Sequence, residues 1–184
     1  PEDAIDLGLT GPALRGSGVP YDIRKANPYL GYENYDFDVP VTTEGDAYSR
    51  YLCRFEEMRQ SLRIIQQAID NLPDGPYAAD LPDVVLPEKK LTYTRMESLI
   101  RHFVLVYEGF KPEPGEVQHA VENPKGELSY YLISDGSGKP YRMRVRGPSF
   151  VNMQALSQMV KGSLIADVIA AIGSLDIVLG EIDR

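Results

Sequence analysis

The longest regular pattern of hydrophobic positions in this chain runs from residue 45 to residue 72. Apolar side chains recur there at steps of three and four, which places them on one side of a long helix. The stripe comprises Tyr48, Tyr51, Leu52, Phe55, Met58, Leu62, Ile65, Ile69 and Leu72. We predict that this helix is the spine of the fold, with the middle of the stripe facing inward. The residues predicted to face inward are Phe55, Met58, Leu62 and Ile65.

A second helical pattern follows at residues 94–107. Thr94 and Glu97 stand three residues apart at its start, which is the spacing of a capping box. Two further apolar runs, near residues 150–160 and 164–172, predict shorter helices toward the end of the chain. The sequence therefore favours a fold dominated by helices.

Between these helical patterns lie three runs with the composition and alternation of β-strands. They are expected at residues 116–123, 127–134 and 141–146. The sequence Asp135-Gly136-Ser137-Gly138 joins the second and third runs as a hairpin. We therefore predict a small antiparallel sheet, and an α+β fold class.

Two segments lack any sustained period. Residues 1–43 are rich in Gly and Pro, yet they carry more aromatic side chains than disordered segments usually do. We expect them to form an ordered, irregular segment packed on a larger body, and residues 73–91 to form a proline-rich connector. Length favours a single domain over residues 1–184, in which helices and a small sheet over residues 44–184 follow the irregular segment.

Charge and hydropathy narrow the classes of partner. The 184 residues carry 27 acidic and 19 basic side chains, for a net charge of -8. Binding to nucleic acid or to anionic lipid requires positive charge, so direct contact with either is disfavoured. The sequence also contains no run of 18 apolar residues, the length that a membrane-spanning helix needs. Any membrane association is therefore expected to go through a protein partner.

Candidate metal ligands are few and scattered. The single cysteine, Cys53, cannot form an internal disulfide, which is typical of a reducing compartment. His102 and His119 fall on different predicted elements and lack the spacing of metal ligands. We interpret both histidines as structural or surface residues and predict no metal site.

The C-terminal tail alternates acidic and branched apolar residues. Asp176, Glu181 and Asp183 stand among isoleucine, valine and leucine side chains. A frayed tail does not usually show this alternation, so we expect the tail to dock against protein. Carboxyl groups in a partly apolar setting resist ionisation and can handle protons. The alternative is a segment that closes a core while its acids face outward.

The tail also ends a series of short sequence blocks that follow one order along the chain. They are residues 11–18 (GPALRGSG), 21–25 (YDIRK), 37–41 (FDVPV), 45–48 (GDAY), 50–54 (RYLCR), 57–61 (EMRQS), 124–127 (PKGE), 134–137 (SDGS) and 173–184 (GSLDIVLGEIDR). Together they resemble the C-terminal half of the quinone-site subunit of respiratory complex I, known as the D-type subunit in bacteria and the 49-kDa type in mitochondria. The absence of an initiator methionine at Pro1 is what we expect of a fragment.

This family is similar to the large subunit of nickel–iron hydrogenases, so the resemblance implies a hydrogenase-large-subunit-like fold. Hydrogenases bind nickel through two cysteines near the C-terminus, since thiolates are soft and anionic. Aligned on Asp176, this chain has Val178 and Glu181 at the cysteine positions and Arg184 at the position of a histidine. A hydrogenase is thereby excluded. The resemblance implies a metal-free cavity, with Asp176, Val178 and Glu181 in the wall of a quinone pocket.

The function that the resemblance implies is that of a subunit of proton-translocating NADH:quinone oxidoreductase. Quinone is the expected substrate, the chain itself is expected to bind no cofactor, and electrons are expected from an iron–sulfur cluster in a partner subunit. The proton-donating His and Tyr of the family lie outside this chain. The expected partners are other complex I subunits at the cytoplasmic side of the bacterial inner membrane, or at the matrix side in mitochondria. The alternative function is a metal-free, hydrogenase-like structural scaffold.

Overall fold

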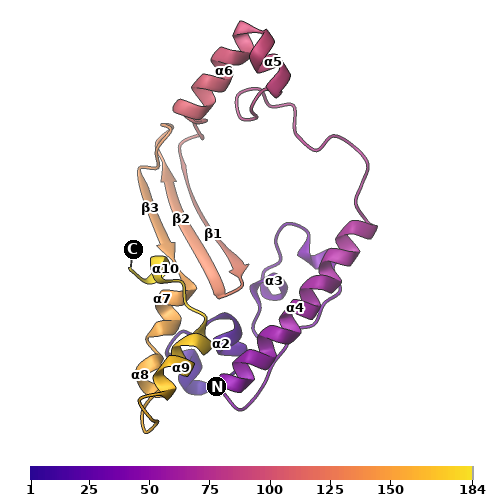
Figure 1. Cartoon of the computed structure of the whole chain (residues 1–184). Coiled ribbons are helices and arrows are strands. Elements are labelled where there is room, and N and C mark those ends of the chain that lie inside the picture. Colours follow the sequence, from indigo (N-terminus) through magenta and orange to yellow (C-terminus); the bar gives the residue numbers. More distant parts are fainter. Residues whose placement is uncertain (184) are drawn as a thin grey trace. The chain divides into compact units, whose positions relative to one another are not determined.

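The computed structural model describes residues 1–183 and shows a largely helical α+β chain with one three-stranded antiparallel sheet (Figure 1). The predicted fold class is therefore confirmed. The chain divides into two compact units. Unit 1 comprises Pro1–Leu72, Gln118–Tyr130 and Val145–Arg184, and unit 2 comprises Pro73–Val117 and Tyr131–Arg144.

The first 43 residues form short helices joined by turns, which the sequence pattern did not predict individually. They are α1 (Glu2–Asp6), α2 (Gly11–Arg15), α3 (Ile23–Ala26) and the 3-10 helix η1 (Tyr32–Asn34). Local chemistry accounts for two of the starts. Pro12 lies in the first turn of α2, where its missing N–H costs nothing, and the Asp22 carboxylate caps α3 by accepting from Arg24 N at 2.9 Å.

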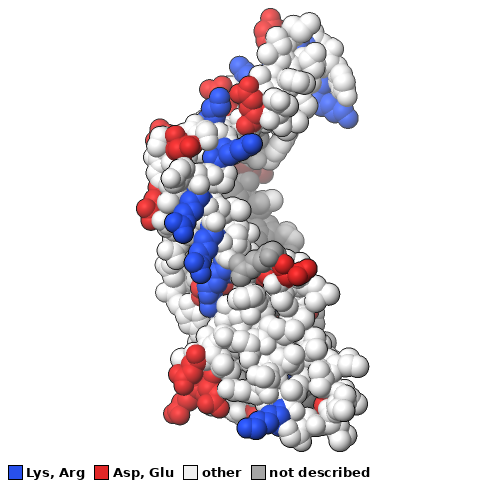
Figure 2. Space-filling model, turned by 90° about the vertical axis from the view of Figure 1, so that its left-hand side faces the viewer, with Lys and Arg blue, Asp and Glu red and all other residues white. Residues whose placement is uncertain are grey.

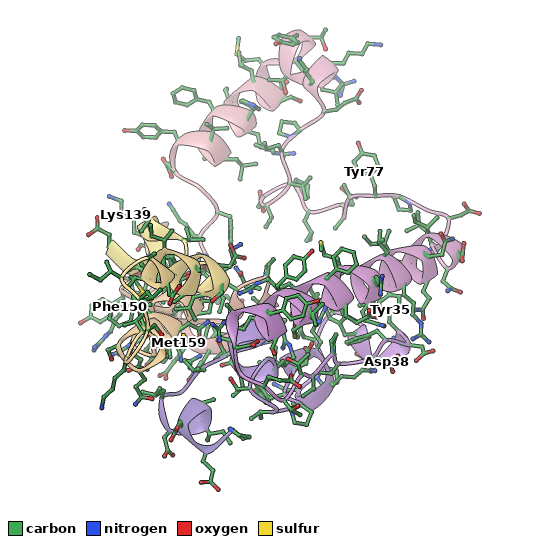
Figure 3. The ribbon with its side chains drawn as sticks, turned by 60° about the horizontal axis from the view of Figure 1, so that its bottom comes forward. Tyr35, Asp38, Tyr77, Lys139, Phe150 and Met159 are labelled. Atoms are coloured by element: carbon green, nitrogen blue, oxygen red, sulfur yellow. The ribbon has the colours of Figure 1, made fainter. Side chains whose placement is uncertain are left out.

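The predicted long helix is present as α4 (Ala47–Asp70). Asp46 caps its start, since the carboxylate accepts from Ser49 N at 2.7 Å. The segment that contains Tyr35 and Asp38 lies alongside the helix (Figure 3), and its backbone donates to two glutamine side chains of α4. These contacts fix the C-terminal half of α4 to the N-terminal segment.

The predicted inward orientation of the α4 stripe is wrong. Phe55, Met58, Leu62 and Ile65 are all exposed, Leu62 to 66%. The side of α4 that is buried, against α2 and α9 (Asp167–Leu175), carries Ser49, Arg50 and Cys53 instead. No described element of unit 1 covers the apolar side, so within this unit the helix packs through its small and polar residues.

The core of unit 1 is formed by its two ends. The buried cluster consists of Ala4, Leu9, Ala13, Leu14, Ala155 and Leu175. The C-terminal region, which supplies Ala155 and Leu175, contains four short helices rather than the two that were predicted. They are α7 (Pro148–Met153), α8 (Leu156–Met159), α9 (Asp167–Leu175) and α10 (Leu179–Asp183).

The three predicted strands are present in sequential order as β1 (Gly115–Asn123), β2 (Gly126–Ser134) and β3 (Arg142–Arg146). The turn between β1 and β2 packs tightly on α2. A Cβ placed on Gly11 would lie 2.5 Å from Gly126 Cα, and Gly126 has a φ of +136°. Asn152, fully buried on α7, donates to Lys125 O at 3.2 Å and so ties the same turn to the C-terminal helices.

In unit 2, the helix predicted at residues 94–107 is present as α6 (Met96–Tyr107), and a short helix, α5 (Lys89–Thr94), precedes it. The predicted capping box is wrong. Thr94 ends α5, where its hydroxyl donates to Lys90 O at 2.9 Å, and α6 starts after Arg95 without a side-chain cap. The extended backbone of Arg95 separates α6 from α5, a short helix that the sequence pattern did not predict.

Charged side chains are unevenly distributed along the strands. Arg142, Arg144 and Arg146 alternate along β3 and so share one side of the strand, and basic side chains follow one another on this face in Figure 2.

None of the helices described for residues 1–183 has the length and apolar character needed to cross a membrane.

Candidate functional site

A cavity of about 540 Å³ opens in unit 1 beside the N-terminal half of α4. It is lined by Arg15, Arg24, Tyr51, Arg54, Phe55, Glu57, Met58, Ser61, Glu122, Asn123, Pro124 and Asp176. These residues come from α2, α3, α4, the end of β1 with its turn, and the C-terminus of α9. The cavity therefore collects side chains from distant parts of the sequence around one of the predicted site residues.

One wall of the cavity is apolar. It is formed by Tyr51, Phe55 and Met58, which lie on successive turns of α4. The rings of Tyr51 and Phe55 are 6.3 Å apart between centroids and tilted by 31°. Part of the stripe that was predicted to fill a core is thus the wall of a cavity, a surface suited to a flat apolar ring.

Charged and polar groups, in contrast, surround Arg15, which is 2% exposed. Its guanidinium donates to Glu57 Oε1 at 2.6 Å, to Glu122 Oε1 at 2.9 Å and to the Tyr21 carbonyl at 2.9 Å. These bonds satisfy a buried cation and join α2, α4 and β1.

The pKa values of this cluster follow from burial and charge. Burial disfavours the Arg15 cation, but Glu122 and Glu57 outweigh it, so the pKa of Arg15 is raised. Burial also raises the pKa of Glu122, and Arg15 offsets that effect only in part. The cavity thus borders a carboxyl group that takes up a proton more readily than an exposed glutamate does.

Asp176 lies at the rim of the cavity, directly after α9. Its φ of +54° is left-handed, a conformation that aspartate tolerates better than most residues and that turns the chain out of the helix. Its Oδ2 accepts from Lys125 Nζ at 2.8 Å and lies 3.8 Å from Arg54 Nε. With its side chain 41% exposed, Asp176 combines two cationic neighbours with access to the cavity.

Arg54 is the cationic side chain that α4 contributes next to Asp176. Its Nη1 donates to the Arg50 carbonyl at 3.3 Å, whereas its buried Nε has no hydrogen-bond partner within residues 1–183. Burial lowers the pKa of Arg54, and Asp176 opposes that effect. A cation is therefore held at the cavity with one N–H group unused.

The other two predicted site residues lie against the start of α7 and not among the residues that line this cavity. Val178 N donates to Ser149 Oγ at 3.3 Å, and Glu181 Oε2 accepts from Ser149 N at 3.2 Å. A Cβ on Gly147 would collide with the Glu181 side chain, which would have to move away from its present position. Arg184 lies outside the described residues. The tail is thus docked against α7, with Asp176 alone of the three at the cavity.

Sequence reasoning missed the cluster around Arg15, together with Arg54 and Lys125. Arg15 stands 42 residues from Glu57 and 107 from Glu122, so no local spacing could reveal the contacts. A weak signal was present, because Arg15, Arg54 and Glu57 all lie within the blocks that carried the family resemblance.

The described residues also show where the candidate metal ligands lie. Cys53 Sγ is buried, 3.5 Å from both the Pro40 carbonyl and Glu57 Oε1, and the His119 ring packs edge-on against Tyr29 at 5.5 Å. Within residues 1–183, His, Cys, Asp and Glu side chains do not converge in any group of three that could hold a metal ion. That the chain binds no metal stays a prediction.

The fold is α+β, and its cavity combines an aromatic wall with charged side chains. The family model described as respiratory-chain NADH dehydrogenase, 49 Kd subunit, matches residues 1–184. The chain belongs to this family, as its sequence blocks predicted.

Similar proteins are named as the D-type subunit of NADH-quinone oxidoreductase. Those of Geotalea uraniireducens (strain Rf4) and Geobacter metallireducens are 60% and 59% identical to this chain over 183 residues, which is 100% of this chain and 47% of each relative. The protein of Methylacidiphilum infernorum is 56% identical over the same length, 44% of its own. The chain thus spans about half the length of the relatives it matches.

Proposed function

We propose that this chain forms part of the quinone-reduction pocket of an NADH-quinone oxidoreductase, and that it is active only within the assembled complex. Family membership supports the complex, and the name of the relatives supports quinone as the substrate. The proposal of a pocket rests on the position of Asp176, which lines a cavity with an aromatic wall and several charged side chains.

The chemistry of quinone reduction fits such a cavity. The ring is flat and apolar, so Tyr51 and Phe55 can pack against it. Reduction adds two electrons and two protons, which raises the negative charge on the ring oxygens before they are protonated. Cations and titratable groups close to those oxygens stabilise that charge. The electrons come from an iron–sulfur cluster of a partner subunit, and this chain contributes the surroundings.

The remaining parts of the proposal follow from the family. The chain assembles with other complex I subunits, among them the subunit that holds the terminal iron–sulfur cluster. It lies at the cytoplasmic side of the bacterial inner membrane, or at the matrix side in mitochondria, and reaches the membrane through those partners. Val178 and Glu181 extend the pocket wall beyond Asp176, on the surface that lies along α7.

Substitutions in the assembled complex test this function. Asp176→Asn keeps the shape of the side chain and removes its charge, so quinone reduction is expected to fall about tenfold, the effect of losing a charged hydrogen bond. Val178→Met is expected to shift the affinity for quinone or for pocket inhibitors. NADH oxidation by an artificial acceptor is expected to stay normal in both variants.

Two matched controls separate a pocket from a scaffold. Asp183→Asn changes an exposed acid of the same tail, and Ile169→Met changes an exposed apolar residue of α9. Both are expected to leave quinone kinetics unchanged. If Asp176→Asn and Val178→Met only reduce the amount of assembled complex, with normal quinone kinetics in what assembles, the chain is a structural scaffold.

A further inference from the structure

The outer strand of the sheet has an open edge. Within residues 1–183, β3 pairs with β2 alone, in a sheet of order β1-β2-β3 (Figure 1). Tyr141 N donates to Ile133 O at 2.9 Å, so these two residues form a hydrogen-bonded pair of the antiparallel ladder. Because such pairs alternate along a ladder, the backbone groups of Arg142 and Arg144 point away from β2. They are left for one further strand.

The side chains of this edge are exposed on both faces of the sheet. Arg142 and Arg144 point to one face, and Tyr141 and Met143 point to the other. Tyr141 is 74% exposed and Met143 is 56% exposed. All four residues lie in unit 2. Protein interfaces are enriched in tyrosine, methionine and arginine, so the composition of this edge is typical of a contact surface.

The two arginines lack acidic partners in the described part of the chain. Farther along the strand, Arg146 Nη1 lies 3.5 Å from Glu127 Oε1, whereas neither Arg142 nor Arg144 forms an ion pair within residues 1–183. Basic side chains follow one another where Figure 2 looks onto this side of the molecule. The chain as a whole has the opposite sign, with a net charge of -8. Charge complementarity therefore favours an acidic partner at this edge.

Charged side chains on an edge strand have a second use, which is to keep one sheet from pairing with another. That use does not require apolar side chains such as Tyr141 and Met143 to stay exposed between the charges. A strand with charge on one face and apolar surface on the other is suited to pair with a strand of matching pattern. The edge of β3 thus indicates the sequence pattern of its partner.

We propose that the edge of β3 in unit 2 binds an extended acidic segment of another subunit of the complex. The segment adds a strand to the sheet, with Asp or Glu beside Arg142 and Arg144 and apolar side chains beside Tyr141 and Met143. Its backbone bonds to the outward groups of the two arginines, and the opposite charges select it. This inference rests on the proposed assembly with other complex I subunits and not on the quinone pocket.

Carbodiimide cross-linking of the assembled complex identifies the partner. In the full-length subunit, Arg142→Lys or Arg144→Lys keeps the positive charge and introduces an amine, which carbodiimide joins to a carboxylate in direct contact. We expect each variant to give a cross-link to Asp or Glu of another subunit, in a stretch that alternates acidic and apolar residues. Cross-links that are absent from both variants, or that reach only this chain or a second copy of it, would overturn the proposal.

Arg95→Lys is the matched control for cross-linking, because Arg95 is an exposed arginine of unit 2 that lies outside the sheet. It is expected to give no cross-link to the same stretch. NADH oxidation by ferricyanide shows that each variant complex is intact. If the β3 cross-links form while Asp176→Asn and Val178→Met leave quinone kinetics unchanged, the predicted pocket wall is wrong and the docking site stands.

Charge reversal separates docking from protection of the edge. Arg142→Glu together with Arg144→Glu is expected to raise the dissociation constant between the full-length subunit and the cross-linked partner about 10- to 100-fold, since like charges then face each other. Lys89→Glu together with Lys90→Glu makes the same change of charge at exposed positions of α5, and is expected to change it by no more than about twofold. If the arginine variant binds the partner normally but associates with itself, the arginines only protect the edge and the proposal is wrong.

Discussion

Close packing at single residues holds the cavity in shape. The turn between β1 and β2 carries Lys125, and its position depends on the contact between Gly11 and Gly126. No side chain fits between these two glycines, and Gly126 also has a positive φ. The ion pair between Lys125 and Asp176 therefore depends on a backbone contact as much as on charge.

Gly126→Ala is expected to destabilise the protein by about 2 kcal/mol or more, since overpacking and a positive φ both oppose a Cβ there. The added methyl would overlap Thr10 Oγ1 and the backbone of Gly11. Gly115→Ala is the control, because a Cβ on Gly115 meets nothing within 4 Å. Chemical denaturation of both variants checks the difference, and equal stability would show that the turn is free to move.

The Cys53 thiol makes the stability of the fold depend on pH. Burial, followed by the nearby Glu57 carboxylate, raises the pKa of its thiol from 9.0 to about 12. A raised folded-state pKa stabilises the fold fully below pH 9, and this contribution is lost as the pH rises toward 12.

At pH 8, alkylation of Cys53 is therefore expected to be slower in the folded than in the unfolded chain, on the order of 1,000-fold from the thiolate population alone. Because Cys53 is the only cysteine of the chain, iodoacetamide labelling followed by mass spectrometry measures this directly. Equal labelling rates in buffer and in denaturant would contradict the buried position.

At the scale of elements, periodicity predicted where helices and strands occur better than it predicted which of their sides are buried. The long helix and all three strands were predicted to within a few residues, because 3.6-residue and two-residue periods are local properties. The short helices before residue 43 escaped prediction, since four or five residues are too few to show a period. The orientation of α4 was wrong because an apolar stripe indicates burial without saying which surface covers it.

Two leucines make the correction to α4 measurable. Leu175 is 1% exposed at the end of α9, whereas Leu62 is 66% exposed. Leu175→Ala is expected to cost about 2–5 kcal/mol of unfolding free energy in this chain. Leu62→Ala is expected to change it by no more than about 0.5 kcal/mol. Urea titrations of the two variants measure both changes. A large loss of stability for Leu62→Ala would show that the apolar stripe of α4 is buried after all.

In the candidate site, too, the sequence predicted residues that have a local pattern and missed residues that only the fold brings together. Asp176 was predicted from the tail and does reach the cavity, whereas Arg15, Arg54 and Lys125 come together only in the folded chain. The burial of Arg15 could not be predicted from its sequence, because arginine is usually exposed and two of its partners here are distant carboxylates.

At the scale of the whole molecule, the exposed side of α4 and the cavity belong together. The stripe runs the length of the helix, and its N-terminal part forms the aromatic wall of the cavity. Apolar surface of this extent is typical of a region that contacts other protein or a ligand. A member of a family of respiratory-complex subunits is expected to have such a surface.

The central claim is that quinone approaches the cavity formed by α4 and Asp176. The most direct measurement is photoaffinity labelling of the assembled complex with an azido-substituted quinone, followed by mass spectrometry of this subunit. The account predicts labels near Tyr51, Phe55 or Met58, and their loss in the presence of excess unmodified quinone. Labels that compete with quinone but fall only elsewhere in the complex, with none on α4 or beside Asp176, would contradict it.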